Sequence, residues 1–399
     1  MYTKEKNNIL IVSHMFPNKE YPLNGLFVKE QLLFLKDLVN LSVIAPVPFF
    51  PFINFTKKYR KISQVPAIEE DNHIKVVHPR YFFVPKFFKS ADAFLYRASL
   101  DKFFVKFLKK NNVDILHFHW GFPDALAGIR WAKRFSIKTV LTVHGNESIC
   151  FFENSFRKKM MVSRLKNIDH IIAVSNDLKN KILKYYDFPE DRITVITNGV
   201  DPKKFYSEDR TNARKECGLD LSCRYILTVA RLSEEKGIKD LLNAFSNLKK
   251  EKIKLIIAGD GPLKNQLIEF SKALKINDKV NFLGAVLNED LRNWYNAADI
   301  FCLPSLWEGL PCTIAESLAC GTPVVATKVG GIPDRINKGN GILVPPSSPD
   351  MLSVALVEAL AKKWDRKGIS DKELPNSLHN LAVQVVEVYK KVLGVESGK

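Results

Sequence analysis

The chain has 399 residues, which is too long for one ordinary hydrophobic core and suits two domains. Hydrophobic residues make up 46% and charged residues 26%, the balance of a soluble globular protein. The formal net charge is +17, and residues 1–200 hold 31 Lys and Arg against 18 Asp and Glu. Such a basic half predicts an anionic partner: a nucleic acid, a phosphorylated ligand or an acidic membrane.

Neither the cysteines nor the apolar runs indicate secretion or a membrane span. The six cysteines form no C-x-x-C pair and several lie in apolar runs, which favours buried reduced thiols over disulfides or a zinc site. The most apolar stretch, Leu41–Phe55, contains three prolines and cannot span a bilayer as a helix. The short apolar run Ile9–Val12 predicts a strand rather than a signal peptide, so we expect a cytoplasmic protein.

The first half of the chain alternates short apolar runs with amphipathic stretches. Strands are predicted at Ile9–Val12, Leu41–Ala45, Ile115–Phe118, Thr139–Val143 and Ile171–Val174. Helices are predicted at Gly25–Leu38, Asp124–Phe135 and Asp177–Tyr186. Strands that alternate with helices imply right-handed βαβ units and a parallel, doubly wound sheet.

The same pattern restarts after a polar segment. Strands are predicted at Arg224–Val229, Lys254–Ala258, Val280–Phe282, Ile300–Leu303 and Val324–Ala326. Helices are predicted at Gly237–Leu248, Pro262–Leu274, Pro311–Ala319 and Ser377–Leu393. The segment Asp201–Ser222 lacks an apolar period. We therefore predict an N-terminal domain at 1–205, a linker at 206–222, a C-terminal domain at 223–376, and a last helix in 377–399 that packs back on the N-terminal domain.

Two carboxylates flank the start of one predicted helix in the second domain. Glu308 and Glu316 are eight positions apart, which places Glu308 before the helix and Glu316 on its body. The N–H groups near Cys312 and Thr313 lie at the helix start, where they can meet a phosphate. Gly309 allows the backbone to approach a ligand closely. Open α/β sheets bind ligands at the carboxyl ends of their strands, where this segment is expected.

A basic pair and a glycine turn also follow predicted strands. Arg231 and Lys236, five positions apart, suit a diphosphate through fork and point-charge contacts. Gly259 and Gly261 form a turn at the end of the next strand, but the third glycine of a dinucleotide fingerprint is missing.

These motifs together resemble glycosyltransferase family 4, a retaining family with the GT-B fold, and the resemblance covers nearly the whole chain. Besides the residues above, it rests on Asn198–Asp201, Asn296–Ile300, Ala319–Ala326 and Gly330–Pro333. The resemblance implies that Glu308 contacts the donor sugar and Glu316 the ribose hydroxyls. It also implies that Arg231 and Lys236 bind the diphosphate and stabilise it as it leaves. The donor-binding segment would include Gly309, Leu310, Cys312 and Thr313 together with Gly259 and Gly261.

The N-terminal half carries further parts of the resemblance. Pro22–Gln31 looks like the family's first glycine loop, in which Gly25 approaches the donor phosphates. Leu116–Asp124 and Thr142–Asn146 look like acceptor-side strands of a branch that acts on bacterial surface polysaccharides. His144 matches a histidine that contacts the donor sugar near its 6-position. Many relatives have Asp where this chain has Glu147.

The resemblance implies retaining transfer of a hexose-type sugar from a UDP- or GDP-sugar to a lipid-linked or polysaccharide acceptor. Without a placed protein nucleophile, retention implies front-face displacement, in which the leaving diphosphate helps to take the acceptor proton. Family members generally need no metal cofactor, and this chain has no D-x-D at a strand end in a plausible donor site. Two alternatives remain open: a nucleotide-sugar epimerase of the GT-B type and a non-catalytic nucleotide-sugar-binding protein.

Several of these residues also have simpler interpretations. Taken alone, the glutamates could be helix-flanking charges, and the basic pair could be surface charges. His117 and His119 share a strand face and with His144 invite a zinc interpretation, but a carboxylate or thiol at ligand spacing is missing. Ser13 and His14 at a strand end could suggest a hydrolase, but no elbow glycines surround Ser13.

The segment Val47–Lys110 is both aromatic and basic. Some of its aromatic residues could belong to the core, with the lysines merely solvated. Phenylalanines beside lysines also suit an anionic bilayer or a single-stranded nucleic acid. The two-domain enzyme signature favours the membrane over nucleic acid, so we expect peripheral attachment to the inner face of the cytoplasmic membrane.

Overall fold

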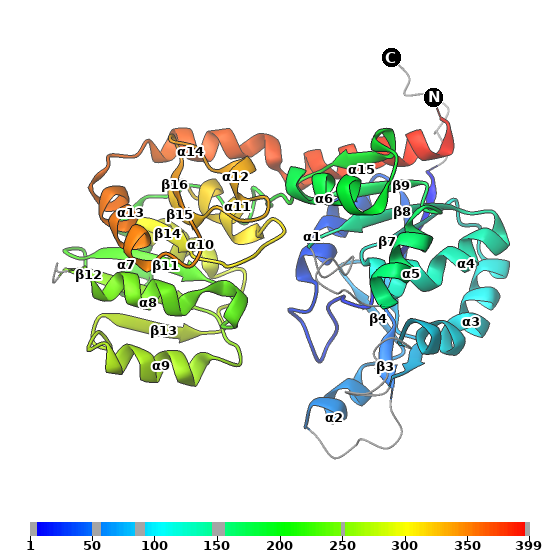
Figure 1. The fold of residues 1–399 in the computed structure, drawn as a ribbon, viewed down its shortest axis with the longest axis horizontal. Coiled ribbons are helices and arrows are strands. Elements are labelled where there is room, and N and C mark those ends of the chain that lie inside the picture. The colour runs from blue at the N-terminus through cyan, green and yellow to red at the C-terminus, as the bar shows by residue number, and fades with distance from the viewer. Residues whose placement is uncertain (1–5, 50–56, 84–91, 146–155, 249–251, 396–399) are drawn as a thin grey trace. The chain divides into compact units, whose positions relative to one another are not determined.

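The computed structural model describes residues 6–49, 57–83, 92–145, 156–248 and 252–395. The chain divides into two compact units (Figure 1). Unit 1 contains residues 1–197 and 378–399, and unit 2 contains residues 198–377. Glu147, Cys150, and parts of the aromatic and basic segment lie outside the described residues.

Unit 1 is built on an eight-stranded sheet with the order β10-β9-β8-β7-β1-β2-β5-β4. Its neighbouring strands pair in parallel except β4, which pairs antiparallel with β5 at the edge. The strands are β1 Asn8–Val12, β2 Asn40–Ile44, β4 Ile68–Asp71, β5 Ile74–Val77, β7 Ile115–Phe118, β8 Lys138–Val143, β9 His170–Ala173 and β10 Ile193–Val195. A separate parallel pair joins β3 Val47–Phe49 to β6 Arg80–Phe82. Because β1 pairs with β2 on one side and with β7 on the other, the strand order reverses between β1 and β7.

Unit 1 also contains helices, some of which contact the eight-stranded sheet while others contact the separate pair of β3 and β6. They are α1 Leu26–Leu35, α2 Lys57–Gln64, α3 Asp92–Lys110, α4 Leu126–Phe135, α5 Phe156–Leu165, α6 Asn176–Tyr186 and α15 Leu378–Leu393. The last helix, red in Figure 1, packs on α1 through Leu381, Val385 and Val388, which share a core cluster with Val28 and Leu32. The apolar stripe of α15 therefore belongs to the N-terminal core, although it lies at the far end of the chain.

Unit 2 has a six-stranded, entirely parallel sheet with the order β13-β12-β11-β14-β15-β16. The strands are β11 Arg224–Val229, β12 Ile253–Ala258, β13 Val280–Gly284, β14 Ile300–Leu303, β15 Val324–Thr327 and β16 Gly341–Val344. In chain order this is the 3-2-1-4-5-6 arrangement of a doubly wound fold, in which the order reverses between β11 and β14.

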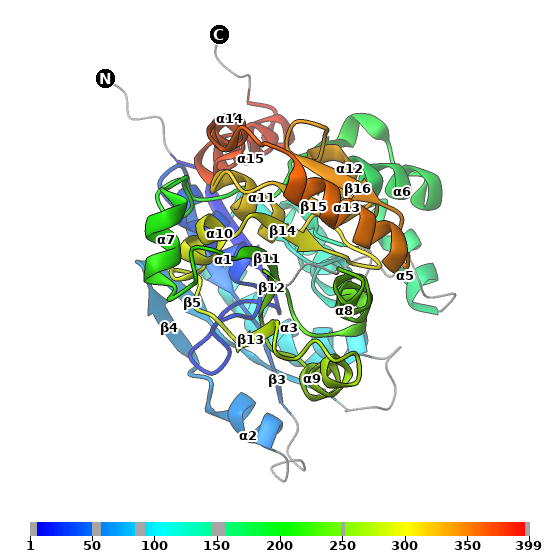
Figure 2. The ribbon, with the colours of Figure 1, turned by 90° about the vertical axis from the view of Figure 1, so that its left-hand side faces the viewer.

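Helices cover both faces of the unit 2 sheet, as Figure 2 shows with α8, α9 and α13 on one side and α7 and α10 on the other. The helices are α7 Arg210–Glu216, α8 Ile238–Ser246, α9 Lys264–Ala273, α10 Leu291–Ala297, α11 Cys312–Ala319, α12 Ile332–Arg335, α13 Pro349–Ala361 and α14 Arg366–Glu373. Successive residues of β11 point to opposite faces: Tyr225 and Leu227 join one core cluster and Ile226 joins the other.

The predicted linker differs from the structure. Residues 198–222 belong to unit 2, and residues 210–216 form α7 against α10. This helix lacks an apolar period because a charge anchors it: buried Arg214 pairs with Asp299 at 2.6 Å and donates to the carbonyl of Ala297 at 3.0 Å. An ion pair and a backbone bond thus replace the apolar stripe that sequence periodicity detects.

The structure also bears on the cysteines and the apolar runs. The five cysteines in the described residues are free thiols, and Cys223, Cys302 and Cys320 are buried. Burial raises the pKa of the Cys302 and Cys320 thiols above the ordinary value. Among the helices of the described ranges, none is both long and apolar enough to cross a membrane.

Candidate functional site

The loops that follow β11 and β14 meet at the point where the strand order of unit 2 reverses. The backbone N–H of Leu306 donates to the carbonyl of Glu235 at 2.8 Å. Gly237 has a φ of +61°, and a Cβ there would lie 2.1 Å from the carbonyl oxygen of Pro304. Only glycine lets these two loops approach so closely. Ligands of open α/β sheets bind at such a reversal, so the two loops mark the candidate site of unit 2.

An ion pair joins two of the predicted site residues across these loops. The Lys236 Nζ lies 2.6 Å from Glu308 Oε1, and Ser305 Oγ donates to the same oxygen at 2.7 Å. The side chains of Lys236 and Glu308 are only 21% and 9% exposed, so water screens the pair weakly. The structure therefore holds a lysine ammonium in one place at the carboxyl end of the sheet.

Arg231 lies on the loop after β11, the same loop that carries Lys236. Its side chain is exposed, and it forms no ion pair with any residue in the described ranges. A backbone hydrogen bond joins this loop to the loop after β12: Leu232 N–H donates to the carbonyl of Asp260 at 2.9 Å. Arg231 thus stands on a rigid loop with a guanidinium that is available to an anion.

Gly259 and Gly261, in the turn after β12, allow two loops to pack closely. A Cβ at Gly259 would lie 1.9 Å from the carbonyl oxygen of Ala230, and one at Gly261 would lie 2.4 Å from that of Leu232. Contact between the loops after β11 and β12 therefore explains both glycines, whether or not they also touch a donor.

Two hydrogen bonds from other parts of unit 2 hold the segment from Glu308 to α11 in place. Asn198 Nδ2 donates to the carbonyl of Leu310 at 2.6 Å, and Gly331 N–H donates to that of Gly309 at 2.7 Å. α11 begins at Cys312, one residue later than predicted, and its N-cap, Pro311, has extended backbone and makes no side-chain cap. Cys312 and Thr313, which are half-buried, thus form the first turn of α11. The backbone N–H groups of a first helical turn are free to bind an anion.

Glu316 occupies a different environment from Glu308. It is buried in α11, and its Oε2 accepts a hydrogen bond from the Tyr295 hydroxyl at 2.7 Å. Burial and the nearby Glu316 carboxylate raise the pKa of Tyr295 well above its ordinary value of 10. Tyr295 therefore remains a neutral donor at any physiological pH, which fixes the orientation of Glu316.

The two remaining predicted residues, Gly25 and His144, lie in unit 1. Gly25 precedes α1 with a φ of +68°, and a Cβ there would lie 2.2 Å from the carbonyl oxygen of Met15. His144 follows β8, and its Nε2 lies 3.0 Å from His119 Nδ1. Burial lowers the pKa of His144 to about 3, so the ring is neutral at neutral pH. Its Nδ1 is buried and has no hydrogen-bond partner among the residues that the structure describes.

His117, one of the three histidines that invited a zinc interpretation, has both ring nitrogens in hydrogen bonds. His117 Nδ1 lies 2.6 Å from the Tyr389 hydroxyl, and its Nε2 lies 2.8 Å from Thr142 Oγ1. Both of its nitrogens are therefore occupied. These contacts are those of a packing residue, so His117 has no free nitrogen for a metal ion.

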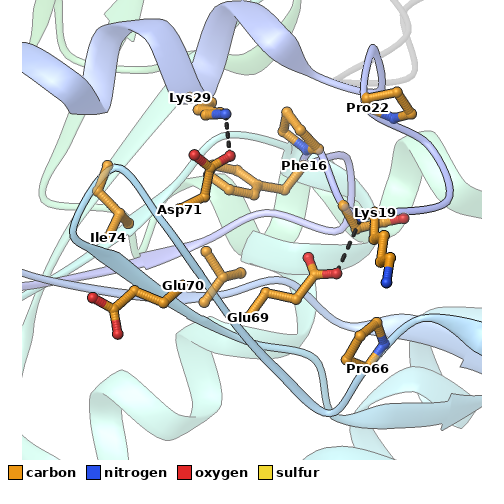
Figure 3. Close-up of a pocket in the computed structure, with 12 residues that line it drawn as sticks. Phe16, Lys19, Pro22, Lys29, Pro66, Glu69, Glu70, Asp71 and Ile74 are labelled. Atoms are coloured by element: carbon orange, nitrogen blue, oxygen red, sulfur yellow. Dashed lines mark hydrogen bonds and ion pairs between the residues drawn. The ribbon is translucent and has the colours of Figure 1, made fainter.

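A separate hollow of about 390 Å³ lies beside the loop that follows β1 (Figure 3). Lys29 from α1 points toward Asp71, and Glu69 accepts from the backbone N–H of Lys19 at 3.1 Å (Figure 3). Glu69 also pairs with His78 at 3.2 Å. Two of the three carboxylates that line the hollow, those of Glu69 and Asp71, thus have partners. None of the predicted site residues lines this hollow.

Sequence patterns did not identify the residues that hold the site together. Ser305 and Tyr295 orient the two glutamates, and Asn198 holds the start of α11 from about 110 positions away. Asn198 and Asn296, next to Tyr295, belong to motifs that carried the family resemblance, which was the available signal. Serine and tyrosine give no periodic signal of their own.

Comparison with known proteins gives the same family for both halves of the chain. Residues 64–204 match the model described as Glycosyltransferase Family 4, and residues 209–374 match Glycosyl transferases group 1. The chain is 30% identical over 379 residues to the putative teichuronic acid biosynthesis glycosyltransferase TuaC of Bacillus subtilis. That alignment covers 93% of this chain and 92% of its relative.

Solved structures share the fold. Sucrose-phosphate synthase of Thermosynechococcus elongatus superimposes with a TM-score of 0.77 at 19% identity, covering 98% of this chain and 100% of that one. HepE of Anabaena in complex with UDP gives 0.71 at 17% identity, with 96% and 100% covered. At these identities the likeness concerns the fold alone, which is the GT-B fold that the sequence predicted.

Proposed function

Since the chain belongs to glycosyltransferase family 4 and is therefore a transferase, we propose that its donor is a UDP- or GDP-hexose. The proposed acceptor is a lipid-linked or polysaccharide glycan of the cell surface. The observation that carries the donor proposal is the 2.6 Å pair of Lys236 and Glu308 at the reversal point of the unit 2 sheet. There a held ammonium, the exposed Arg231 and the start of α11 provide positive charge for a diphosphate.

The proposed reaction retains configuration by front-face displacement. The bond between the sugar C1 and the diphosphate oxygen breaks, and the acceptor oxygen bonds to C1 from the same face. The acceptor proton passes to the leaving diphosphate. Arg231 and Lys236 stabilise the negative charge that develops on this group, which makes them the residues with the largest effect on the barrier.

The two glutamates hold the donor in this proposal. Glu308 keeps Lys236 in place and contacts the sugar, together with Gly309–Thr313. Glu316 binds the ribose hydroxyls in the orientation that Tyr295 imposes. The family resemblance assigns His144, whose Nδ1 has no partner among the described residues, to the donor sugar and Gly25 to the donor phosphates, and we carry over both roles. No metal cofactor is needed, because the basic pair and the helix start supply the positive charge.

Two further observations support the proposed acceptor and location. The relative TuaC is named for teichuronic acid biosynthesis, a polysaccharide pathway. Residues 1–200 carry most of the positive charge, which favours a lipid-linked acceptor at an anionic membrane. We therefore place the protein at the inner face of the cytoplasmic membrane.

Turnover of single alanine variants tests the proposal. A panel of nucleotide sugars, assayed in EDTA for slow hydrolysis and for protection against melting, first identifies the donor. Lys236→Ala and Arg231→Ala should then each lower turnover roughly 100-fold or more, the usual effect of removing one transition-state donor. Lys239→Ala, an exposed lysine on α8, is the matched control. Wild-type turnover in either variant, with the melting temperature unchanged, would refute the assignment.

A further inference from the structure

A hollow of about 360 Å³ lies in unit 2 at the edge of the sheet where the strands begin. Arg224 is the first residue of β11, and Asp299 directly precedes β14; both line the hollow. Lys236 and Glu308 instead follow the carboxyl ends of these two strands. Strand β11 has six residues, so its ends lie about 20 Å apart. The hollow is therefore separate from the proposed donor site.

Positive charge dominates the wall of this hollow. Five cationic side chains line it, and we call it the basic hollow for this reason: Arg210, Arg224, Lys362, Lys363 and Arg366. Among the described residues that line it, Asp299 has the only carboxylate. One negative charge leaves most of these positive charges without compensation, and like charges at close range repel one another. An anion in the hollow would relieve this repulsion.

The carboxylate of Asp299 is shared among several donors. Its side chain is 3% exposed, and its Oδ1 lies 2.9 Å from Arg210 Nη1 and 3.2 Å from Arg224 Nη1. Its Oδ2 accepts from Arg214 at 2.6 Å and from the backbone N–H of Tyr225 at 2.7 Å. The Arg210 and Arg224 side chains are 43% and 56% exposed, and within the described ranges each bonds only to Asp299. Their other N–H groups are therefore available to a second anion.

Arg366 adds a fixed positive charge. It donates to the carbonyls of Ala298 and Asn296 at 2.9 and 3.1 Å, and within the described ranges it forms no ion pair. Burial and then the charge of Arg210 lower the pKa of Arg366 to about 10, so the guanidinium is still charged at neutral pH.

Two lysines complete the basic hollow. Lys362 Nζ lies 3.9 Å from the centre of the Trp364 ring and donates to the carbonyl of Lys338 at 2.6 Å, which holds the ammonium in place. The indole is fixed in turn, because its Nε1 donates to the carbonyl of Ala359 at 2.8 Å. Lys363 is exposed and has no hydrogen bond or ion pair from its side chain within the described ranges. Its ammonium is therefore free to meet a ligand.

We propose that the basic hollow binds the phosphate or diphosphate group of a small molecule, as an anion site apart from the donor. Guanidinium groups bind two phosphate oxygens at once, and ammonium groups add point charges. A phosphate ester offers three oxygens and close to two charges, whereas a carboxylate offers two oxygens and one charge. The volume suits one small molecule rather than a polymer.

The indole signal of Trp364 in the ¹⁵N-labelled full chain tests the inference. It is identified by its loss in Trp364→Phe. Pyrophosphate should shift this signal saturably, whereas acetate at the same ionic strength should not. The inference is wrong if pyrophosphate produces no saturable shift.

Matched variants show whether pyrophosphate occupies the basic hollow. Lys363→Gln and Arg224→Gln should each raise its Kd roughly fivefold, the usual worth of one hydrogen bond. Lys363→Gln breaks no contact of the described residues, so it decides the matter if Arg224→Gln fails to fold. Lys367→Gln, at an exposed position of α14 outside the hollow, should leave the Kd unchanged. An unchanged Kd in Lys363→Gln overturns the inference.

Two further arms separate this site from the donor site and identify the source of the phosphate. Lys236→Ala should leave the Trp364 response intact, and a lost response would place the pyrophosphate at the donor site and overturn the inference. An intact response without protection by any nucleotide sugar would instead refute the donor proposal alone. Phosphatidic acid vesicles carry the same group on a lipid. Weaker sedimentation of Lys363→Gln than of Lys367→Gln would identify a lipid headgroup as the source, and equal sedimentation a soluble ligand.

Discussion

Glu308 and Glu316 lie eight residues apart but bind different partners. Glu308 meets an ammonium and a serine hydroxyl, whereas Glu316 meets a tyrosine hydroxyl inside the core. Two carboxylates that shared a proton as acid and base would need a common site. Their separate partners instead suit two different roles. Glu308 orients Lys236, and Glu316 is a carboxylate of fixed orientation that can accept hydrogen bonds from a ligand.

Tyr295→Phe tests the second of these roles. The change removes the hydroxyl that donates to Glu316 but keeps the ring that packs against Phe301. A hydrogen bond to a charged group is worth about 1.5–3 kcal/mol, so the Kd for UDP should rise roughly tenfold. Calorimetry with UDP measures it. Tyr225→Phe, in the same core cluster, is the matched control, and an equal Kd in Tyr295→Phe would contradict the role.

The buried histidines make the stability of unit 1 depend on pH. Burial lowers the pKa of His117 and His144 to about 3, and that of His119 falls well below its ordinary value. In an unfolded chain these groups titrate near pH 6.5. Between about pH 6.5 and 3 the unfolded state therefore binds more protons, so the free energy of unfolding falls as the pH falls through this window.

His117→Gln should reduce this dependence. Each histidine contributes about 1.4 kcal/mol per pH unit within the window. Between pH 6.5 and 5 the variant should lose about 2 kcal/mol less than the wild type, as measured by urea unfolding. His379→Gln, at an exposed histidine on α15, serves as the control. The same loss in His117→Gln as in the wild type would show that His117 is not held neutral.

At the scale of elements, the contact between the loops after β11 and β14 depends on Gly237. An alanine there would meet the carbonyl of Pro304, and its φ of +61° costs any other L-residue about 1–2 kcal/mol. Gly218 offers a matched control, because its φ is +65° and nothing lies within 4 Å of an added Cβ. Both Gly→Ala changes carry the same backbone cost, so their difference isolates the loop contact.

Gly237→Ala should therefore lower both stability and turnover, whereas Gly218→Ala should lower stability alone. The clash moves the loop that carries Lys236, so turnover should fall roughly tenfold or more, as expected for misplaced catalytic groups. Melting curves and turnover of the purified variants measure the two effects. Equal turnover in both variants would mean that the loop contact does not position Lys236.

Several elements with an apolar pattern could be predicted from sequence. Strands β1 and β11 are mostly apolar, and α15 has an apolar stripe. Helix α7 was missed because an ion pair anchors it, β16 begins with Gly341, and the apolar stripe of α3 lies in a segment interpreted as a membrane-binding surface. Periodicity detects burial of apolar side chains and does not detect an anchor made by charge.

Part of the candidate site could be predicted from sequence, and part depends on contacts that only the fold brings together. Motif order identified Arg231, Lys236, Glu308 and Glu316, and Lys236 and Glu308 do meet in the structure. The bond between His14 and Asp124 joins residues 110 positions apart. Only the pairing of β1 with β7 brings them together, so no local pattern contains it. Ser13 and His14 invited a hydrolase interpretation, but Ser13 Oγ donates to the carbonyl of Met15 at 2.7 Å.

At the scale of the whole molecule, the two units have the same organisation with different chemistry. Each sheet reverses its strand order once, between β1 and β7 in unit 1 and between β11 and β14 in unit 2. The unit 2 reversal carries fixed positive charge, which suits a diphosphate. The unit 1 reversal is flanked by buried His119 and His144, and burial lowers the pKa of both rings. The two reversal points therefore differ in charge: ionised groups lie at the unit 2 reversal and uncharged rings beside the unit 1 reversal.

Unit 1 also carries the charge that bears on membrane attachment. The aromatic residues of its basic segment divide between two roles: Tyr96 and Phe104 are in the core, while Phe49 and Phe94 are 48% and 60% exposed. Helix α3 presents four exposed lysines near its end, Lys102, Lys106, Lys109 and Lys110. A cluster of exposed lysines is what an anionic bilayer surface attracts.

Vesicle sedimentation tests this attachment. The wild type should sediment with phosphatidylglycerol vesicles at low salt and be released at high salt, because salt screens exposed charges. Replacing the four α3 lysines by glutamine should abolish binding, since each contributes about 1 kcal/mol near such a surface. The same change at four exposed lysines of unit 2, Lys252, Lys254, Lys272 and Lys367, is the matched control. Equal sedimentation with neutral phosphatidylcholine vesicles, or equal loss in both variants, would place the attachment elsewhere than on α3.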